Sequence, residues 1–324
     1  MKKAVLNAFF LFCIALSLHA FPSAETKNRE LIIYGIKGSS GIGLIRLFEE
    51  PPRVPGFEVK AEALAQADLV AARFISGEAK IGILPPNVAA KIASSGKNIK
   101  AAAVIGMGML SLLSSDPQIR RLEDLRGKSV EVAGQGATPD YVFRRLLLNK
   151  GLNPDTDLRL GYSLAHSEIA QALIANRIST ALLPEPFASM ARSARPDLHL
   201  VTDIEEEWKQ INQGENFPMT ILAAEGNFCS ENPGALSIIM ESIKNSIEWT
   251  VNNPAEAALL AEKYEMGFPP GAAVLAIPRS NYVFIPAAQA RSSLESLFDT
   301  FLHFSPVSIG GALPGDGFYL SHEN

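Results

Sequence analysis

One stretch of this sequence occurs twice. Residues 74–91 return 99 residues later, without a gap, as residues 173–190, and at the same offset residues 34–40 align with residues 133–139. Both copies of the longer segment predict a helix, a short polar turn, an apolar strand, a turn that contains proline, and a second helix. We interpret the repeat as two lobes of the same α/β topology. Two similar lobes that face each other form a cleft.

Two details argue against the alternative, which is a chance match between alanine-rich amphipathic helices. The Leu-Pro dipeptide at 84–85 falls on Leu-Pro at 183–184, and Gly35 falls on Gly134. Proline and glycine mark turns rather than helix faces, so agreement at both is hard to obtain from helical periodicity alone.

The first residues predict an exported protein. Residues 1–3 are a short basic start, residues 4–18 are mostly apolar, and small residues follow at Ala20 and Ala24. The apolar run is too short to span a bilayer comfortably, and polar residues follow it at once. We therefore expect residues 1–24 to be a signal peptide, cleaved after Ala20 or Ala24.

The cysteines allow no intramolecular disulfide in the mature chain. Cys13 lies in the predicted signal peptide, so only Cys229 remains after cleavage and stability must come from buried apolar area. Lipidation of Cys13 is an alternative, although Phe12 precedes it where a lipoprotein site has a small residue.

The composition is that of a compact, mildly acidic globular protein. The chain has 324 residues, of which 47% are hydrophobic and 19% charged, and its net charge is -5. Nucleic-acid binding requires a basic face, which this composition does not favour, so we expect no nucleic-acid partner. No later apolar run is long enough to cross a membrane.

Helices that alternate with short apolar strands predict α/β lobes, each with a doubly wound, mostly parallel sheet, and a hinge between them. Residues 101–113 form one long apolar run, which we expect to be a strand that crosses between the lobes, with a return crossing at 218–224. We assign residues 25–110 and 222–324 to lobe 1, and residues 111–221 to lobe 2. The tail should pack on lobe 1. Its predicted helices cover residues 233–252, 255–264 and 287–304.

Two strand-to-helix loops carry the first candidates for a binding site. In parallel sheets such loops lie at one edge, and the helix that follows points free N–H groups at that edge. The candidates are Gly38, Ser39, Ser40 and Gly41 in lobe 1, and Gly136, Ala137 and Thr138 in lobe 2. The glycines let a ligand approach the backbone, and the hydroxyls donate to the ligand or merely cap their helices. Because the repeat gives Ser39 and Thr138 the same place in their lobes, we expect them to face each other across the cleft.

Four further candidates are Pro86, Asn87, Glu185 and Arg279. The first three lie in the repeated Leu-Pro turns. A carboxylate at a helix start is stabilised by the helix dipole in any protein, which is the alternative role for Glu185. If Glu185 faces the cleft, it suits a ligand with an amine, an amide or another donor. Arg279 either pairs with an anionic ligand or is an ordinary surface residue.

Signals for catalysis are weak. The segment 41–43 lacks the third glycine of a dinucleotide loop, and the chain has neither a Walker loop nor a Gly-x-Ser-x-Gly elbow. The histidines are scattered and lack the spacing of a metal motif. We therefore expect no catalytic residue, no metal site and no cofactor.

Several segments resemble one protein family. They read EDLRGKSV at 123–130, GQGATPDY at 134–141, LPEPFA at 183–188, IPRSNYVF at 277–284 and SIGGALPGDGFY at 308–319. Together they resemble the extracytoplasmic substrate-binding proteins of ABC importers, of the nitrate, sulfonate and taurine type that also includes binders of thiamine pyrimidine precursors. The likeness covers nearly the whole mature chain.

The resemblance implies the two-lobed type II periplasmic-binding-protein fold, with a small-molecule ligand between the lobes. It also implies a membrane permease and an ATPase as partners, and we expect a monomer. The ligand loops of the family correspond to residues 38–41, 86–87, 136–138 and 184–186. The ligand itself does not carry over, because no paired cationic side chains commit the site to a sulfonate. A neutral or aromatic heterocycle and an anion both remain open.

Two other functions fit the same fold. An enzyme, such as a lyase or a pyrimidine-precursor synthase, would need a histidine or a carboxylate pair in the cleft. A sensory binding module would lack a transporter. The signal peptide argues against a cytosolic biosynthetic enzyme, so we expect a solute-binding protein.

Overall fold

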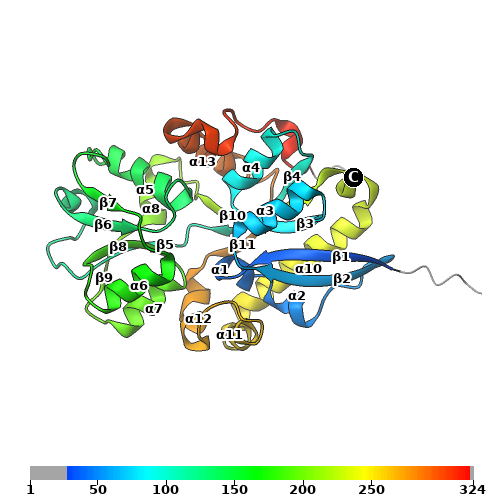
Figure 1. Cartoon of the computed structure of the whole chain (residues 1–324), viewed down its shortest axis with the longest axis horizontal. Helices are drawn as coiled ribbons and strands as arrows, with labels where there is room; N and C mark the ends of the chain where they lie inside the picture. The colour runs from blue at the N-terminus through cyan, green and yellow to red at the C-terminus, as the bar shows by residue number, and fades with distance from the viewer. Residues whose placement is uncertain (1–27, 322–324) are drawn as a thin grey trace, which may run out of the picture.

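The computed structural model describes residues 28–321 of the chain (Figure 1). The predicted signal peptide, its two cleavage sites and Cys13 lie outside the described residues. Within those residues, no helix is both long enough and apolar enough to cross a membrane.

Lobe 1 is built on a six-stranded sheet in the order β11-β4-β10-β3-β1-β2. Strands β2 and β3 run parallel to β1, whereas β10 runs antiparallel to its neighbours β3 and β4. The strands are β1 (Arg29–Ile36), β2 (Phe57–Leu64), β3 (Ile81–Leu84), β4 (Ile99–Met107), β10 (Pro218–Glu225) and β11 (Tyr282–Pro286). The helices between the first four strands are α1 (Ser39–Ile42), α2 (Ile45–Glu49), α3 (Ala67–Ser76) and α4 (Pro86–Ser94). Every residue of β3 is buried, as expected for an apolar strand at the centre of a covered sheet.

Lobe 2 is built on a five-stranded sheet in the order β7-β6-β8-β5-β9. Strands β7 and β8 run parallel to β6, and β5 runs antiparallel to β8 and β9. The strands are β5 (Leu110–Ser114), β6 (Ser129–Val132), β7 (Arg159–Gly161), β8 (Thr180–Pro184) and β9 (His199–Asp203). The helices are α5 (Thr138–Asn149), α6 (His166–Ile174), α7 (Phe187–Ala194) and α8 (Ile204–Ile211).

The repeat seen in the sequence is a repeat of structure. Helix α3 begins at Ala67 and α6 at His166, and strand β3 begins at Ile81 and β8 at Thr180, so both pairs are 99 residues apart. The strand order β2-β1-β3-β10 in lobe 1 corresponds to β7-β6-β8-β5 in lobe 2. In each lobe the last of these strands, β10 or β5, runs antiparallel to the strand beside it, β3 or β8. The prediction of two similar α/β lobes is confirmed, but the sheets are mixed rather than mostly parallel, because β10 and β5 each run antiparallel to both of their neighbours.

The predicted crossing strand is two strands. Strand β4 belongs to lobe 1 and β5 to lobe 2, and only Gly108 and Met109 lie between them. A Cβ atom on Gly108 would lie 2.9 Å from Asn216 Oδ1 and 3.1 Å from Glu205 Oε2, so the crossing passes where a side chain has no room. The chain returns to the sheet of lobe 1 at Pro218. The lobe boundaries after residues 110 and 221 stay predictions.

The tail contacts both lobes, so the expectation that it packs on lobe 1 was incomplete. Its helices are α9 (Gly226–Glu231), α10 (Pro233–Asn252), α11 (Pro254–Lys263), α12 (Pro270–Ala276) and α13 (Arg291–Phe304). Helices α10, α11 and α13 confirm the three predicted helices. Helix α12 packs against α7 and α13 against α5, both in lobe 2, while the unpredicted strand β11 pairs with β4 of lobe 1.

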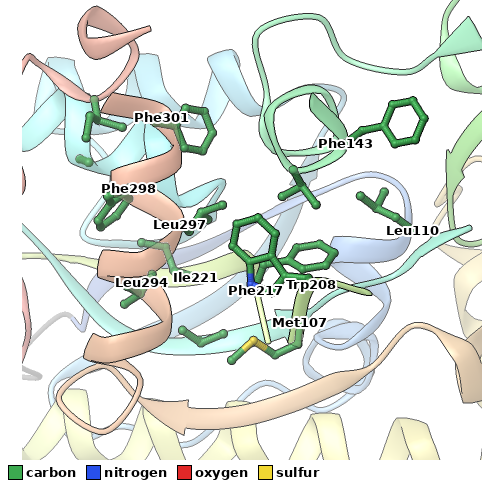
Figure 2. Packing of buried hydrophobic residues seen from close by; sticks show 14 of the residues in the cluster. Met107, Leu110, Phe143, Trp208, Phe217, Ile221, Leu294, Leu297, Phe298 and Phe301 are labelled. Atoms are coloured by element: carbon green, nitrogen blue, oxygen red, sulfur yellow. The ribbon is translucent and has the colours of Figure 1, made fainter. Parts of the chain in front are cut away.

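One apolar cluster continues from lobe 1 into lobe 2. Figure 2 shows Met107 and Phe217 close to Trp208, with Leu110 and Phe143 on the side of lobe 2. The rings of Trp208 and Phe217 meet edge to face, with their centroids 5.5 Å apart. The lobes therefore share an apolar core beside the crossing segments.

Candidate ligand-binding site

The first candidate cluster opens α1 beside the crossing segment. Gly38 has a φ of 106°, which favours glycine. The Ser39 hydroxyl donates to the Met109 sulfur at 3.4 Å, and the Ser40 hydroxyl oxygen lies 3.1 Å from that of Thr220. No side chain caps α1, so the capping alternative is wrong for both serines.

The tail and a tight turn fix this loop. The Tyr282 hydroxyl, on β11, donates to the Ser39 carbonyl at 2.7 Å. Gly41 is buried, and a Cβ atom there would lie 2.3 Å from the Ile36 carbonyl oxygen. The backbone of Gly41 can pack so closely only because it carries no side chain.

The second candidate cluster, residues 136–138, is held in place by the carboxylate of Asp140. Gly136 has a φ of 73°, and its N–H donates to Asp140 Oδ2 at 2.9 Å. Asp140 is 2% exposed and also accepts from Arg144 Nε at 2.7 Å and from the Tyr162 hydroxyl at 2.6 Å. Burial is the main reason that the pKa of Tyr162 is raised, and the hydrogen bond to Asp140 adds to it. The network holds the loop to the first turn of α5.

Two candidate side chains bury an oxygen that has no hydrogen-bond partner in residues 28–321: Thr138 Oγ1 and Asn87 Oδ1. Thr138 is 3% exposed. It follows the N-cap residue Ala137, which makes no side-chain capping bond, so capping does not explain Thr138. Pro86 is the first residue of α4 and Asn87 the second. Buried polar atoms without partners are rare in folded proteins, so each oxygen is a candidate ligand contact.

Glu185 is buried where lobe 2 meets the crossing segment. It is 4% exposed, its N–H donates to the Met109 carbonyl at 2.9 Å, and its Oε2 accepts from the Ser189 N–H at 3.0 Å. Burial raises the pKa of the carboxyl, although Ser189 and Arg279 act in the opposite direction. Since the Ser189 N–H lies in the first turn of α7, the capping role is correct for Glu185.

A pocket of about 400 Å³ lies between the lobes, a size that suits a small ligand. Of the predicted site residues, Glu185 and Arg279 line it, whereas Ser39, Ser40, Asn87 and Thr138 do not. Buried Met109 and Glu185 line it together with exposed Arg192 and Arg279. Arg279 Nη1 donates to its own chain at the Leu275 carbonyl, at 2.8 Å. The pocket thus combines a buried carboxyl with two exposed guanidinium groups.

The structure brings together three of the predicted residues. Ser39 and Glu185 both bond to Met109. Arg279 Nη1 donates to the hydroxyl of Ser189 at 3.4 Å, and the N–H of the same serine donates to Glu185. No hydrogen bond joins Ser39 to Thr138 among the described residues, so their juxtaposition stays a prediction.

Sequence reasoning missed three residues that shape the site: Met109, Asp140 and Tyr282. Met109 belongs to an apolar run that reads as one strand. Asp140 lies one helical turn after Gly136, a spacing that could have identified it as the anchor of the loop. Tyr282 reaches Ser39 from a distant part of the sequence, for which one sequence contains no local signal. Among the described residues, no group of three histidine, cysteine or carboxylate side chains could hold a metal ion.

Comparison with protein families identifies the class. Residues 53–290 match the model of the family described as ABC transporter, phosphonate, periplasmic substrate-binding protein. The chain belongs to this family. As a phosphonate-type periplasmic substrate-binding protein, it is the solute-binding component of an ABC importer. The family consists of binding proteins rather than enzymes.

Solved structures agree on the two-lobed fold of this periplasmic substrate-binding protein. An ABC transporter protein from Parabacteroides distasonis is 24% identical, with a TM-score of 0.79 over 91% of this chain and 100% of the other. The periplasmic aliphatic sulphonate binding protein SsuA from Escherichia coli is 16% identical, with a TM-score of 0.71 over 90% and 92%. The periplasmic nitrate-binding protein NrtA from Synechocystis PCC 6803 is 12% identical, with a TM-score of 0.56 over 76% and 69%. No curated protein matches this chain in sequence.

Proposed function

We propose that this substrate-binding protein is exported, encloses a small polar solute between its lobes, and delivers it unchanged, as a monomer, to a permease and an ATPase. Membership of the periplasmic family supports export and the importer partners. The absence of a catalytic motif in the sequence favours delivery without reaction.

The observation that carries the site is the pair of buried oxygens without partners, Asn87 Oδ1 in lobe 1 and Thr138 Oγ1 in lobe 2. Each lies at the start of a helix that follows a strand, the edge at which ligands bind in α/β sheets. We infer that the ligand bonds to both residues, with Ser39, Ser40 and the backbone of 136–138 beside them.

The first candidate ligands are phosphonates, because the family is described by that ligand. Sulfonates and nitrate come next, since two structurally similar proteins are named for binding them. Pyrimidines remain in the set because the hydroxyl and amide contacts are neutral. A hydroxyl both donates and accepts, so it fits either kind of ligand.

Native mass spectrometry of the purified protein, followed by thermal melting with each candidate, tests the proposal. A ligand at 100 times its Kd should stabilise the folded protein by about 2.7 kcal/mol. The ligand should be recovered with its mass unchanged. Chemical conversion of the bound molecule would support an enzyme instead, and retention of no ligand together with no stabilisation by any candidate would contradict the proposal.

A further inference from the structure

Residues 278–281 of the tail contact lobe 2 at two points. Arg279 Nη1 donates to Ser189 Oγ on α7 at 3.4 Å, and Asn281 Nδ2 donates to Glu205 Oε2 on α8 at 2.8 Å. Just before this segment, α12 packs against α7, and Figure 1 places α12 between α11 of lobe 1 and the helices of lobe 2. The contacts therefore join the two lobes on the side of α12.

The backbone of the same segment is fixed to lobe 1. The Asn281 carbonyl accepts from the Met107 N–H, at the end of β4, at 3.1 Å. Asn281 has a φ of 46°, a left-handed conformation that asparagine tolerates better than most residues. Buried Ser280 donates from its hydroxyl to the Ala276 carbonyl at 2.9 Å. A backbone anchored in one lobe thus directs a side chain to the other.

The groups that receive these bonds adjoin the pocket. Glu205 lines it, and its second oxygen accepts from Lys209 Nζ at 2.8 Å. Ser189 bonds through its N–H to the buried carboxyl of Glu185 at 3.0 Å. Movement of lobe 2 away from the tail would therefore break bonds at the edge of the pocket.

We propose that Arg279 and Asn281 are positioning residues, which hold lobe 2 against lobe 1 and stabilise the arrangement that encloses the ligand. The proposal rests on the proposed function, and it gives Arg279 a contact with lobe 2 in place of the ligand contact expected from the sequence. Loss of one such hydrogen bond should raise the ratio of open to closed molecules about three- to tenfold.

Pulsed electron paramagnetic resonance measures this ratio without any ligand. Spin labels are attached through Leu148→Cys on α5 and Leu259→Cys on α11, positions that are 39% and 60% exposed. The native thiol is removed by Cys229→Ser. Asn281→Gly keeps the left-handed backbone and deletes the amide, so the population at the longer distance should rise. Asn281→Asp places a second carboxylate beside Glu205 and should shift the population further.

A second substitution tests the contact itself. Glu205→Gln supplies an amide donor to the new carboxylate, so in the Asn281→Asp background it should restore the shorter distance. Arg279→Met should act like Asn281→Gly. Asn253→Ala is the matched control, because Asn253 Nδ2 donates to the Trp249 carbonyl at 2.8 Å within lobe 1.

The outcomes separate this proposal from the proposed function. A wild-type protein that shows only the longer distance would overturn the proposal, as would Asn281 variants that lose thermal stability with unchanged distances. Either result would leave the binding of a solute intact. A failure of every candidate ligand, with the distances shifting as expected, would contradict the proposed function alone.

Discussion

Thr138 and Thr180 are two buried threonines of lobe 2 that differ in hydrogen bonding. The Thr180 hydroxyl oxygen lies 2.9 Å from that of Ser114, whereas Thr138 Oγ1 has no partner in the described part of the chain. Thr138→Val should therefore stabilise the unliganded protein by about 1 kcal/mol and weaken ligand binding about tenfold. Thr180→Val should destabilise the protein and leave the affinity unchanged. Denaturant unfolding and calorimetric titration with the retained ligand measure both effects.

One outcome would contradict the prediction for Thr138→Val. A Thr138→Val protein that is less stable and binds with wild-type affinity would show that the hydroxyl serves the fold. Valine is a sharper probe than a bulky arginine, because the side chain is 3% exposed and a larger one would disturb the packing around it.

Glu185 should make stability depend on pH. Burial raises its pKa above the ordinary value of 4.5, so the folded protein binds this proton more tightly than the unfolded chain does. The contribution of Glu185 to stability is then largest at low pH and falls as pH rises through the ordinary value towards the raised one. Glu185→Gln stays neutral, so its stability relative to wild type should increase from about pH 4 to pH 7.

A control of opposite sign is available for this pH series. Arg73 lowers the pKa of Glu78, so the contribution of Glu78 to stability is present above the ordinary value and is lost as pH falls. Glu78→Gln should therefore lose stability relative to wild type as pH rises, by a small amount because the pair is exposed. Thermal melting across the range gives both curves. Parallel curves for wild type and Glu185→Gln would rule out the coupling.

At the scale of elements, α1 depends on one glycine. A Cβ atom on Gly41 would lie 2.3 Å from the Ile36 carbonyl oxygen, whereas a Cβ atom on Gly43 would meet Ile247 and Tyr282 side chains at 3.4 Å. Gly41→Ala should cost about 1–3 kcal/mol and weaken binding, because it displaces α1 and with it Ser39. Gly43→Ala should be nearly neutral. Unfolding curves and ligand titration of the two variants test this, and equal effects would contradict it.

The elements that the sequence predicts well are those with local signals. The 99-residue repeat predicted both central strands, β3 and β8, because turn residues and apolar runs coincide in both copies. The run 101–113 predicts one strand because β4 and β5 are both apolar, and only close packing against Gly108 shows where the chain changes sheet. The candidate loops were found, but the bonds of Arg279 and Asn281 to lobe 2 join residues far apart in sequence. Such contacts leave no local pattern.

At the scale of the whole molecule, the shared apolar cluster should make the lobes unfold together. Trp208 of lobe 2 and Phe217 are both fully buried and in contact. Calorimetry should show one transition, with a van't Hoff enthalpy close to the calorimetric one. Trp208→Ala should lower the stability by about 3–5 kcal/mol. Two transitions in the wild-type protein would contradict the prediction and show that the lobes unfold independently.

The order of strands also has a consequence for how the chain is made. Strand β10 fills the place between β3 and β4 of lobe 1, yet it follows all the strands of lobe 2 in sequence. A chain synthesised from its N-terminus therefore cannot complete its first sheet until all the strands of the second have been synthesised. Such non-local pairing slows folding. The connectivity that joins the lobes thus also delays the completion of the lobe 1 sheet.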